Sequence, residues 1–88
     1  MTIPAILHRS CTYKGVRLSD FIANKGEGLP KHEHTYSHGV MCIAGSCVIR
    51  KENLELVLTP NDSAVVLAAN EWHEIEALED NTIFINME

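Results

Sequence analysis

The sequence has 88 residues, a net charge of -5 at neutral pH, 45% hydrophobic residues and 22% charged residues. A chain of this length is predicted to form one domain over residues 1–88, and its near-average composition excludes a wholly disordered protein. The excess of acidic residues makes nucleic-acid backbones and anionic membrane surfaces unfavourable partners. No apolar stretch approaches the roughly 20 residues of a membrane-spanning helix.

Short apolar or alternating runs recur along the chain and are separated by turn residues. Segment 71–80 also fits a helix, but the strand-like segments around it favour a strand. Six to eight short strands with regular turns are typical of an antiparallel sandwich or barrel, so an all-β fold is predicted. The predicted strands are 16–23, 36–44, 47–50, 54–58, 64–67, 74–78 and 82–87.

The three cysteines, Cys11, Cys42 and Cys47, are odd in number and show no Cys-x-x-Cys spacing. Reduced, buried thiols explain them better than a disulfide framework. The first residues lack the basic and apolar segments of a secretory signal. We therefore expect a cytoplasmic protein, and the sequence assigns no role to the thiols.

Four histidines form a spaced set that suggests metal binding: His32, His34, His38 and His73. Because side chains alternate along a strand, the first three are predicted to project from one side of one strand, with Tyr36 between them. Imidazoles two residues apart can direct their nitrogens to one cation at about 2.0–2.2 Å. The fourth, at the start of a later strand, is predicted to reach the same cation across a small barrel. The alternative is a set of solvated loop histidines.

The segment from Gly26 to Gly45 resembles the first sequence motif of the cupins. That motif reads Gly, five residues, His-x-His, three or four residues, Glu, six residues, Gly. Both glycines, His32 and His34 match it in register. His38 stands in the place of the glutamate, a replacement that some small four-histidine cupins share.

The second cupin motif is matched less closely. His73 supplies its strand-opening histidine, while Asp62, Ala68 and Asn70 stand in the places of Gly, Pro and Gly. Alternatively, the Asn-Asp pair at 61–62 matches the family's Gly-Asp turn with one extra residue before the histidine. Asparagine tolerates positive φ, so both alignments are physically reasonable. The resemblance covers about residues 16–85.

The resemblance implies a single small antiparallel β-barrel of the double-stranded β-helix or jelly-roll type. It also implies one divalent transition metal bound at the barrel mouth by His32, His34, His38 and His73. Imidazole suits Zn, Cu, Fe and Ni and tolerates Mn, so the sequence does not select the metal. Four neutral ligands leave the full 2+ charge on the ion, which predicts a small anionic molecule in the mouth, such as an enolate, a 2-oxo acid or a carboxylate.

Further residues are assigned from their positions near this set. Tyr36 is the candidate catalytic residue, and its alternative is a strand aromatic with a bonded hydroxyl. Cys42 is interpreted as a small buried filler rather than a nucleophile. Trp72 either walls the mouth or caps the barrel, and His8 is assigned to the surface.

Met41 and Ile43 are predicted to face away from the barrel interior. Their strand is therefore apolar on both faces and needs cover on both. We expect that cover to come from a second copy of the chain in a homodimer.

The cupin resemblance is compatible with more than one function. One is a metal-dependent enzyme, a dioxygenase, isomerase or lyase acting on a small oxygenated anion. The alternatives are a non-catalytic metal-loaded module that binds a small molecule, and a barrel whose metal is purely structural. Val40 stands where the dimethylsulfoniopropionate cupin lyases tend to carry tyrosine, which argues against that subtype.

Overall fold

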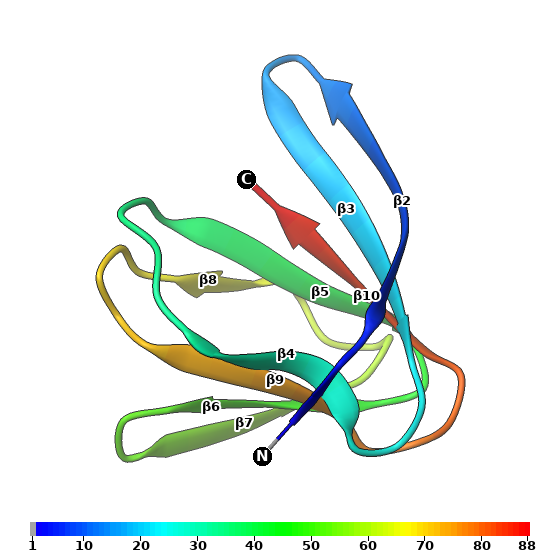
Figure 1. The fold of residues 1–88 in the computed structure, drawn as a ribbon. Helices are drawn as coiled ribbons and strands as arrows, with labels where there is room; N and C mark the ends of the chain where they lie inside the picture. The colour runs from blue at the N-terminus through cyan, green and yellow to red at the C-terminus, as the bar shows by residue number, and fades with distance from the viewer. Residues whose placement is uncertain (1) are drawn as a thin grey trace.

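The computed structural model describes residues 2–88, which form β-strands and no helix (Figure 1). Within these residues, no helix is long and apolar enough to cross a membrane. The all-β prediction is confirmed. The strands are β1 (Ile3–Pro4), β2 (Ile6–Tyr13), β3 (Val16–Ala23), β4 (Glu27–His32), β5 (His38–Ala44), β6 (Cys47–Lys51), β7 (Leu54–Leu58), β8 (Val65–Leu67), β9 (His73–Ala77) and β10 (Thr82–Met87).

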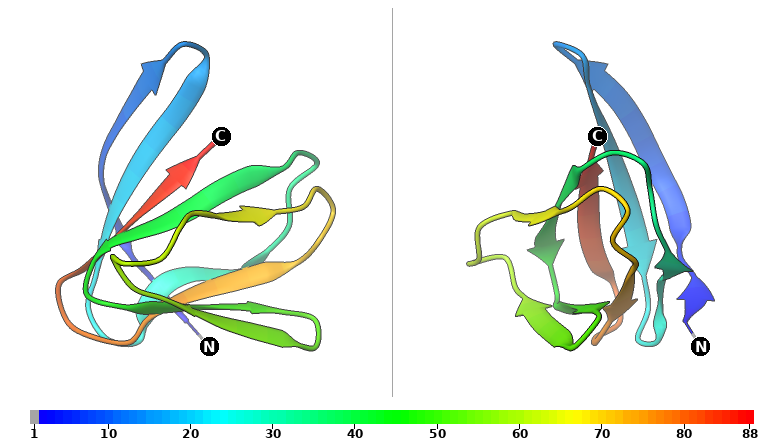
Figure 2. Two further views of the ribbon diagram at one scale, coloured as in Figure 1. Left: turned by 180° about the vertical axis from the view of Figure 1, so that it is seen from behind. Right: turned by 90° about the vertical axis from the view of Figure 1, so that its left-hand side faces the viewer.

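The strands form two five-stranded sheets, with the orders β1-β4-β9-β6-β7 and β2-β3-β10-β5-β8. The neighbouring strands are antiparallel, apart from the short parallel pair of β1 and β4. From β4 onwards the chain crosses repeatedly between the sheets, which is the connectivity of a jelly roll. The two sheets close over each other, and the β2–β3 hairpin extends beyond the rim of the resulting barrel (Figure 1, Figure 2).

The hydrophobic core lies between the two sheets and takes residues from both. Phe84 and Val40 come from one sheet and Ile49 and Ile75 from the other, and all four side chains are fully buried. Phe84 also stacks on Phe21, with ring centroids 5.1 Å apart. A chain of this size buries enough apolar surface only by closing one sheet over the other.

The predicted strands agree with the structure to within one or two residues at their ends. Segments 16–23, 54–58 and 82–87 coincide with β3, β7 and β10, and segment 71–80 contains the strand β9 rather than a helix. The sequence did not predict β1, β2 or β4. Every residue of β2 is exposed, so the strand has no buried face to produce an alternating pattern. Strand β4 contains a glycine and a proline, which are depleted in strands.

Glycine at position 28 permits the close approach of β4 to β9. A side chain at Gly28 would overlap the backbone carbonyl of Ile75. The pairing of these two strands then continues to their ends, where His32 is the register partner of His73. The barrel therefore brings together two of the candidate metal ligands, although they are far apart in the sequence.

Candidate metal centre

The four candidate histidines come from four different places in the fold. His32 is the last residue of β4, His34 lies in the loop that follows, His38 opens β5 and His73 opens β9. The prediction that the first three project from one strand is therefore wrong. The chain leaves one sheet after His32 and joins the other at His38, so these two residues belong to opposite walls of the barrel. The loop and both strand starts lie at one end of the barrel, the left-hand end in Figure 1.

Three of the four histidine rings nevertheless converge on one point. The Nε2 atoms of His32 and His73 are 3.1 Å apart, and one ligand atom from each of His32, His34 and His73 lies within 4.8 Å of the others. His38 lies outside that trio by this measure. Its ring centroid is 4.8 Å from that of His34 and 4.9 Å from that of His73.

Backbone carbonyl groups orient two of the rings. His32 Nδ1 donates a hydrogen bond to the carbonyl of Pro30 at 2.6 Å, and His73 Nδ1 donates one to the carbonyl of Glu71 at 3.0 Å. A carbonyl oxygen can only accept, so each Nδ1 carries the proton and each neutral ring presents an Nε2 lone pair. Two metal–nitrogen bonds of 2.0–2.2 Å at tetrahedral or octahedral angles separate the nitrogens by about 2.8–3.6 Å. The observed 3.1 Å falls in this range.

Buried ring nitrogens without partners provide a second test of whether a metal fits. His38 is 4% exposed, and within residues 2–88 neither of its ring nitrogens has a hydrogen-bond partner; the same holds for His34 Nε2. A buried polar atom left unpaired costs about 1–3 kcal/mol. A neutral imidazole has one lone pair, so a cation bound by His34 Nε2 and by one nitrogen of His38 would remove the cost at those two atoms, and the residues present fit a metal ion.

The environment keeps the buried rings neutral. Burial, followed by the nearby histidines, lowers the pKa of His38 to about 4. Burial also lowers the pKa of His73, and this outweighs the opposing effect of its hydrogen bond to Glu71. The neutral form is the one that binds metal, so at neutral pH these rings need not lose a proton before binding.

The prediction that Tyr36 lies on the same strand face as the histidines is wrong. Tyr36 lies at the rim of the histidine cluster. It is in the loop between β4 and β5, and its side chain is 44% exposed. Its ring stacks on His34 with centroids 4.9 Å apart, and its hydroxyl donates a hydrogen bond to Glu88 Oε2 at 3.0 Å. That hydrogen bond is the main cause that raises the pKa of Tyr36. Glu88 was not predicted, because nothing in its sequence context separates it from other acidic residues.

The remaining sequence assignments can now be placed. Cys42 is buried in the core, as expected for a filler, and His8 is exposed, as expected for a surface residue. Trp72 is half-buried, and Lys31 Nζ lies 4.2 Å from the centroid of its ring. All three cysteines are free, but Cys11 is exposed, so the expectation of buried thiols is wrong for that residue.

The backbone acceptors of the two oriented rings were also not predicted. Each is the carbonyl group of the residue two positions before the histidine, at Pro30 and at Glu71. Every residue type supplies a backbone carbonyl, so no side-chain pattern marks these positions.

The chain is a small two-sheet jelly-roll barrel with clustered imidazoles at one end. Solved structures with this architecture identify the fold as that of the cupins. No protein-family model matches the sequence, and no curated protein matches it.

Three solved structures illustrate the likeness. A cupin-2 domain protein from Shewanella frigidimarina has a TM-score of 0.76 at 11% identity, over 94% of this chain and 81% of that chain. A cupin superfamily protein from Desulfitobacterium hafniense has a TM-score of 0.72 at 18% identity, over 94% and 78% of the respective chains. KdgF from a Halomonas species has a TM-score of 0.78 at 18% identity, over 90% and 73%. The chain therefore has the cupin fold, with a histidine cluster that can hold a metal at the end of its barrel.

Proposed function

We propose that this protein binds one divalent transition metal through His32, His34, His38 and His73 and acts as an enzyme on a small oxygenated anion. The observation that carries the proposal is the 3.1 Å separation of the His32 and His73 Nε2 atoms. With both Nδ1 protons held by carbonyl groups, two lone pairs face each other at this distance. Such an arrangement is repulsive until a cation lies between them.

The ligand set favours an anionic partner. Four neutral imidazoles leave the full 2+ charge of the ion in place, whereas a carboxylate ligand would reduce it. A bound divalent metal supplies a Lewis acid that polarises an oxygen atom of its ligand. Around it, the carbonyl groups of Pro30 and Glu71 hold two imidazoles in the tautomer that binds metal, and the Tyr36 ring packs against a third.

Tyr36 is the residue of this chain that we assign to catalysis. Its hydroxyl is at the rim and bonded to Glu88, so the Glu88 carboxylate is placed to accept the phenol proton. The same hydrogen bond also favours a second candidate, a non-catalytic module that binds a small molecule, because the hydroxyl is already occupied.

Free thiols at all three cysteines agree with the reducing environment of the cytoplasm, where we place the protein.

Metal analysis of His34→Ala tests the metal site directly. The purified wild type is expected to bind one equivalent of metal when titrated with Zn²⁺, Mn²⁺ or Ni²⁺, and His34→Ala is expected to bind at least tenfold more weakly. His8→Ala is the matched control, because His8 is exposed on β2 and should leave binding unchanged. Equal loss of affinity in both variants, or undiminished affinity in His34→Ala, would contradict the site.

Turnover separates the enzyme from the binding module. Oxygen consumption and product formation are measured with enolates and 2-oxo acids for the metal-loaded wild type and for Tyr36→Phe. The proposal predicts turnover that requires metal and that falls at least tenfold in Tyr36→Phe. Saturable binding of the same anions without turnover would favour the module, and turnover that survives removal of the metal would exclude the proposed enzyme.

A further inference from the structure

One of the four candidate ligands, His38, has no group that orients its ring. His32 and His73 each donate a hydrogen bond from Nδ1 to a backbone carbonyl, whereas within residues 2–88 neither ring nitrogen of His38 has a partner. His38 is 4% exposed, so bulk water has little access to it. A histidine that binds a metal through one nitrogen almost always donates the N–H of the other nitrogen to an acceptor. His38 therefore needs an acceptor from a neighbouring part of the chain.

Asn86 in β10 has the opposite deficiency, an acceptor without a donor. Its side chain is 5% exposed, and among the described residues its amide oxygen Oδ1 has no hydrogen-bond partner. Thr82, which is also polar and buried on this strand, differs because its hydroxyl donates to the carbonyl of Glu79 at 2.8 Å. A buried acceptor without a partner is unfavourable, so the stability of the barrel does not explain an amide at position 86.

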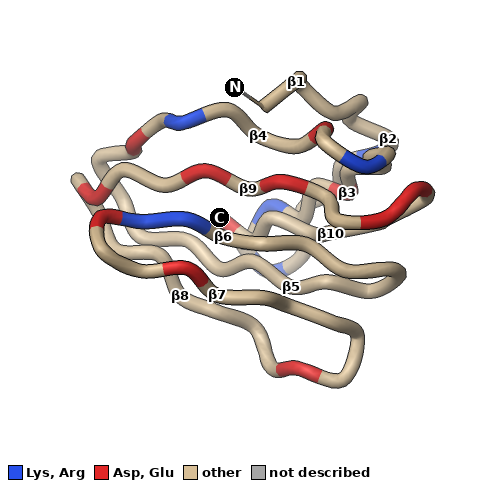
Figure 3. The backbone as a smooth tube through the Cα atoms, turned by 90° about the horizontal axis from the view of Figure 1, so that it is seen from below, with Lys and Arg blue, Asp and Glu red and all other residues tan. Residues whose placement is uncertain are grey.

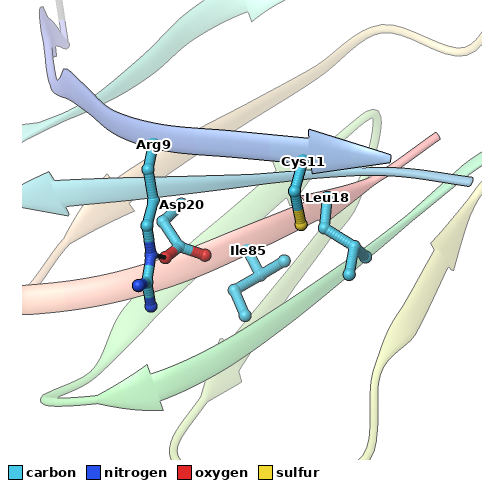
Figure 4. Close-up of a pocket in the computed structure, with 5 residues that line it drawn as sticks. All are labelled: Arg9, Cys11, Leu18, Asp20 and Ile85. Carbon is cyan, nitrogen blue, oxygen red and sulfur yellow. Dashed lines mark hydrogen bonds and ion pairs between the residues drawn. The ribbon is translucent and has the colours of Figure 1, made fainter. Parts of the chain in front are cut away.

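The alternation of side chains along β10 places Asn86 on the inner side of the sheet. Figure 4 shows Leu18 and Ile85 on one side, beside a cavity of about 340 Å³ on the outer face. Asn86 follows Ile85 directly, so its side chain faces the other way, toward the barrel interior. Its register partner in β5 is Val40, which is fully buried in the core. The Asn86 amide therefore faces the same interior as the histidine rings.

His38 and Asn86 lie diagonally across two neighbouring strands. Val40 is opposite Asn86, and His38 precedes Val40 by two residues, so all three side chains lie on the same side of the sheet. Diagonal neighbours of this kind are roughly 7–8 Å apart at the backbone, and larger side chains can meet across that distance. The two side chains are not bonded as they stand, so the bond requires rotation of one or both of them.

Charged groups do not compete strongly for this position. Strands β5 and β10 contain no Lys, Arg, Asp or Glu, and Figure 3 shows both as uncharged tubes. Glu88, directly after β10, is exposed, and its Oε2 accepts the hydrogen bond of Tyr36. Glu71, in the turn before β9, forms an ion pair with Lys51 Nζ at 3.1 Å. The amide oxygen of Asn86 is the buried acceptor on this sheet that has no other partner.

We infer that the Asn86 amide oxygen accepts a hydrogen bond from one ring nitrogen of His38 and thereby directs the other ring nitrogen to the metal. The inference rests on the proposed function, since it concerns one ligand of the proposed metal site. Asn86 is a positioning residue, which acts through His38 and does not itself bind the ion. It does for this ring what backbone carbonyl groups do for the rings of His32 and His73.

Zinc titration of three variants tests the inference. Asn86→Leu keeps the approximate size of the side chain and removes the acceptor, so it is expected to lower zinc affinity about 10–100-fold. Asn86→Asp is expected to bind zinc at least as tightly as the wild type, because a carboxylate accepts the same hydrogen bond. Ser19→Ala is the matched control and should leave affinity unchanged. Ser19 is buried too, but it is the partner of Asn86 on β3, on the side away from β5.

Urea denaturation of the metal-free proteins separates positioning from a general structural role. Because Oδ1 has no partner in the barrel, the unfolding midpoint of metal-free Asn86→Leu is expected to equal or exceed that of the wild type. Zinc affinity should nevertheless fall in the same variant. A parallel loss of metal-free stability and of zinc affinity would identify Asn86 as a structural residue and overturn the inference.

Nuclear magnetic resonance of the zinc-loaded protein, with ¹⁵N-labelled histidine, detects the hydrogen bond itself. A slowly exchanging ring N–H of His38 is expected in the wild type and in Asn86→Asp, and it should be lost in Asn86→Leu. Its persistence in Asn86→Leu, undiminished zinc affinity in that variant, or an equal loss of affinity in Ser19→Ala would overturn the inference and leave the metal site standing. A wild type that binds no zinc, manganese or nickel would instead overturn the metal site, and the inference with it.

Discussion

Replacement of Gly28 by alanine should damage both the fold and the proposed metal site. A Cβ at this position would overlap the carbonyl oxygen and carbon of Ile75 in the neighbouring strand β9. Both atoms belong to the backbone, so no side chain can move aside to accommodate the methyl group. Relief requires β4 and β9 to separate, and β4 is held on both sides by β1 and β9.

The magnitude follows from the hydrogen bonds around this strand. Ala5 N donates to the carbonyl of Gly28 at 2.7 Å, and Gly26 N donates to the carbonyl of Ala77 at 2.9 Å. Loss of two or three such bonds, at about 0.5–1.5 kcal/mol each, predicts a decrease of about 1–4.5 kcal/mol in the free energy of unfolding. A small domain has about 5–15 kcal/mol in total, so this is a large fraction.

The same separation should weaken metal binding, because His32 and His73 face each other across these two strands. Displacement of ligands from their positions is expected to lower metal affinity about 10–100-fold. Urea denaturation measures the stability of the metal-free protein, and isothermal titration calorimetry measures metal affinity. Both are done on Gly28→Ala and on a control variant.

Gly39→Ala is the control. A Cβ at Gly39 in β5 would meet the Cε atom of Met87 at 3.0 Å, and this flexible side-chain end can move. The control is therefore expected to change stability by less than about 1 kcal/mol. If Gly28→Ala unfolds within about 1 kcal/mol of the wild type and binds metal equally well, the described packing of β4 against β9 is wrong.

Three further predictions concern other parts of the fold. Thr2→Val removes the hydrogen bond to Glu74 Oε2 that is the main cause lowering the pKa of Glu74, so it should cost about 1 kcal/mol at neutral pH. The hydrogen bond from Thr2 favours the ionised form of Glu74. In urea denaturation, the difference in stability between wild type and Thr2→Val should therefore shrink as the pH falls below 4.5, and an unchanged difference would contradict the prediction. In dilute folded protein, iodoacetamide should label the exposed Cys11 and spare Cys47, because burial raises the pKa of the Cys47 thiol to about 12. Peptide mass spectrometry detects the label, and rapid labelling of Cys47 would count against its burial. Phe84→Ala should lower the free energy of unfolding by about 3–5 kcal/mol, and a loss below about 1 kcal/mol would show that the site is poorly packed.

The alternating strands were predictable because each has one buried face. In β10, Thr82, Phe84 and Asn86 are buried, and the residues between them are half-buried and apolar. A period of two in burial follows from backbone geometry alone, so a single segment contains the information. Strand β2 has no such period because all of its residues are exposed. The apolar outward positions of β5, Met41 and Ile43, were predictable for the same reason.

The candidate ligand residues could be named from the sequence, because imidazole can bind metal whatever its position in the fold. The sequence contains His32, His34, His38 and His73 at spacings that match a cupin motif. Their arrangement was not predictable. The one-strand prediction failed because residues 33–37 form a crossover between the two sheets, and strand order is a property of pairings between distant segments.

The sequence by itself therefore determined the fold class, most of the strands and the chemistry of the candidate ligands, since each depends on residues close together in the chain. Only the tertiary structure decided which ring nitrogens lie close together. The pairing of β4 with β9 brings the Nε2 atoms of His32 and His73 to 3.1 Å, and the loop before β5 places Tyr36 at the rim beside Glu88. The physical reason is that local patterns record which face of a segment is buried, whereas a site depends on the distance between segments.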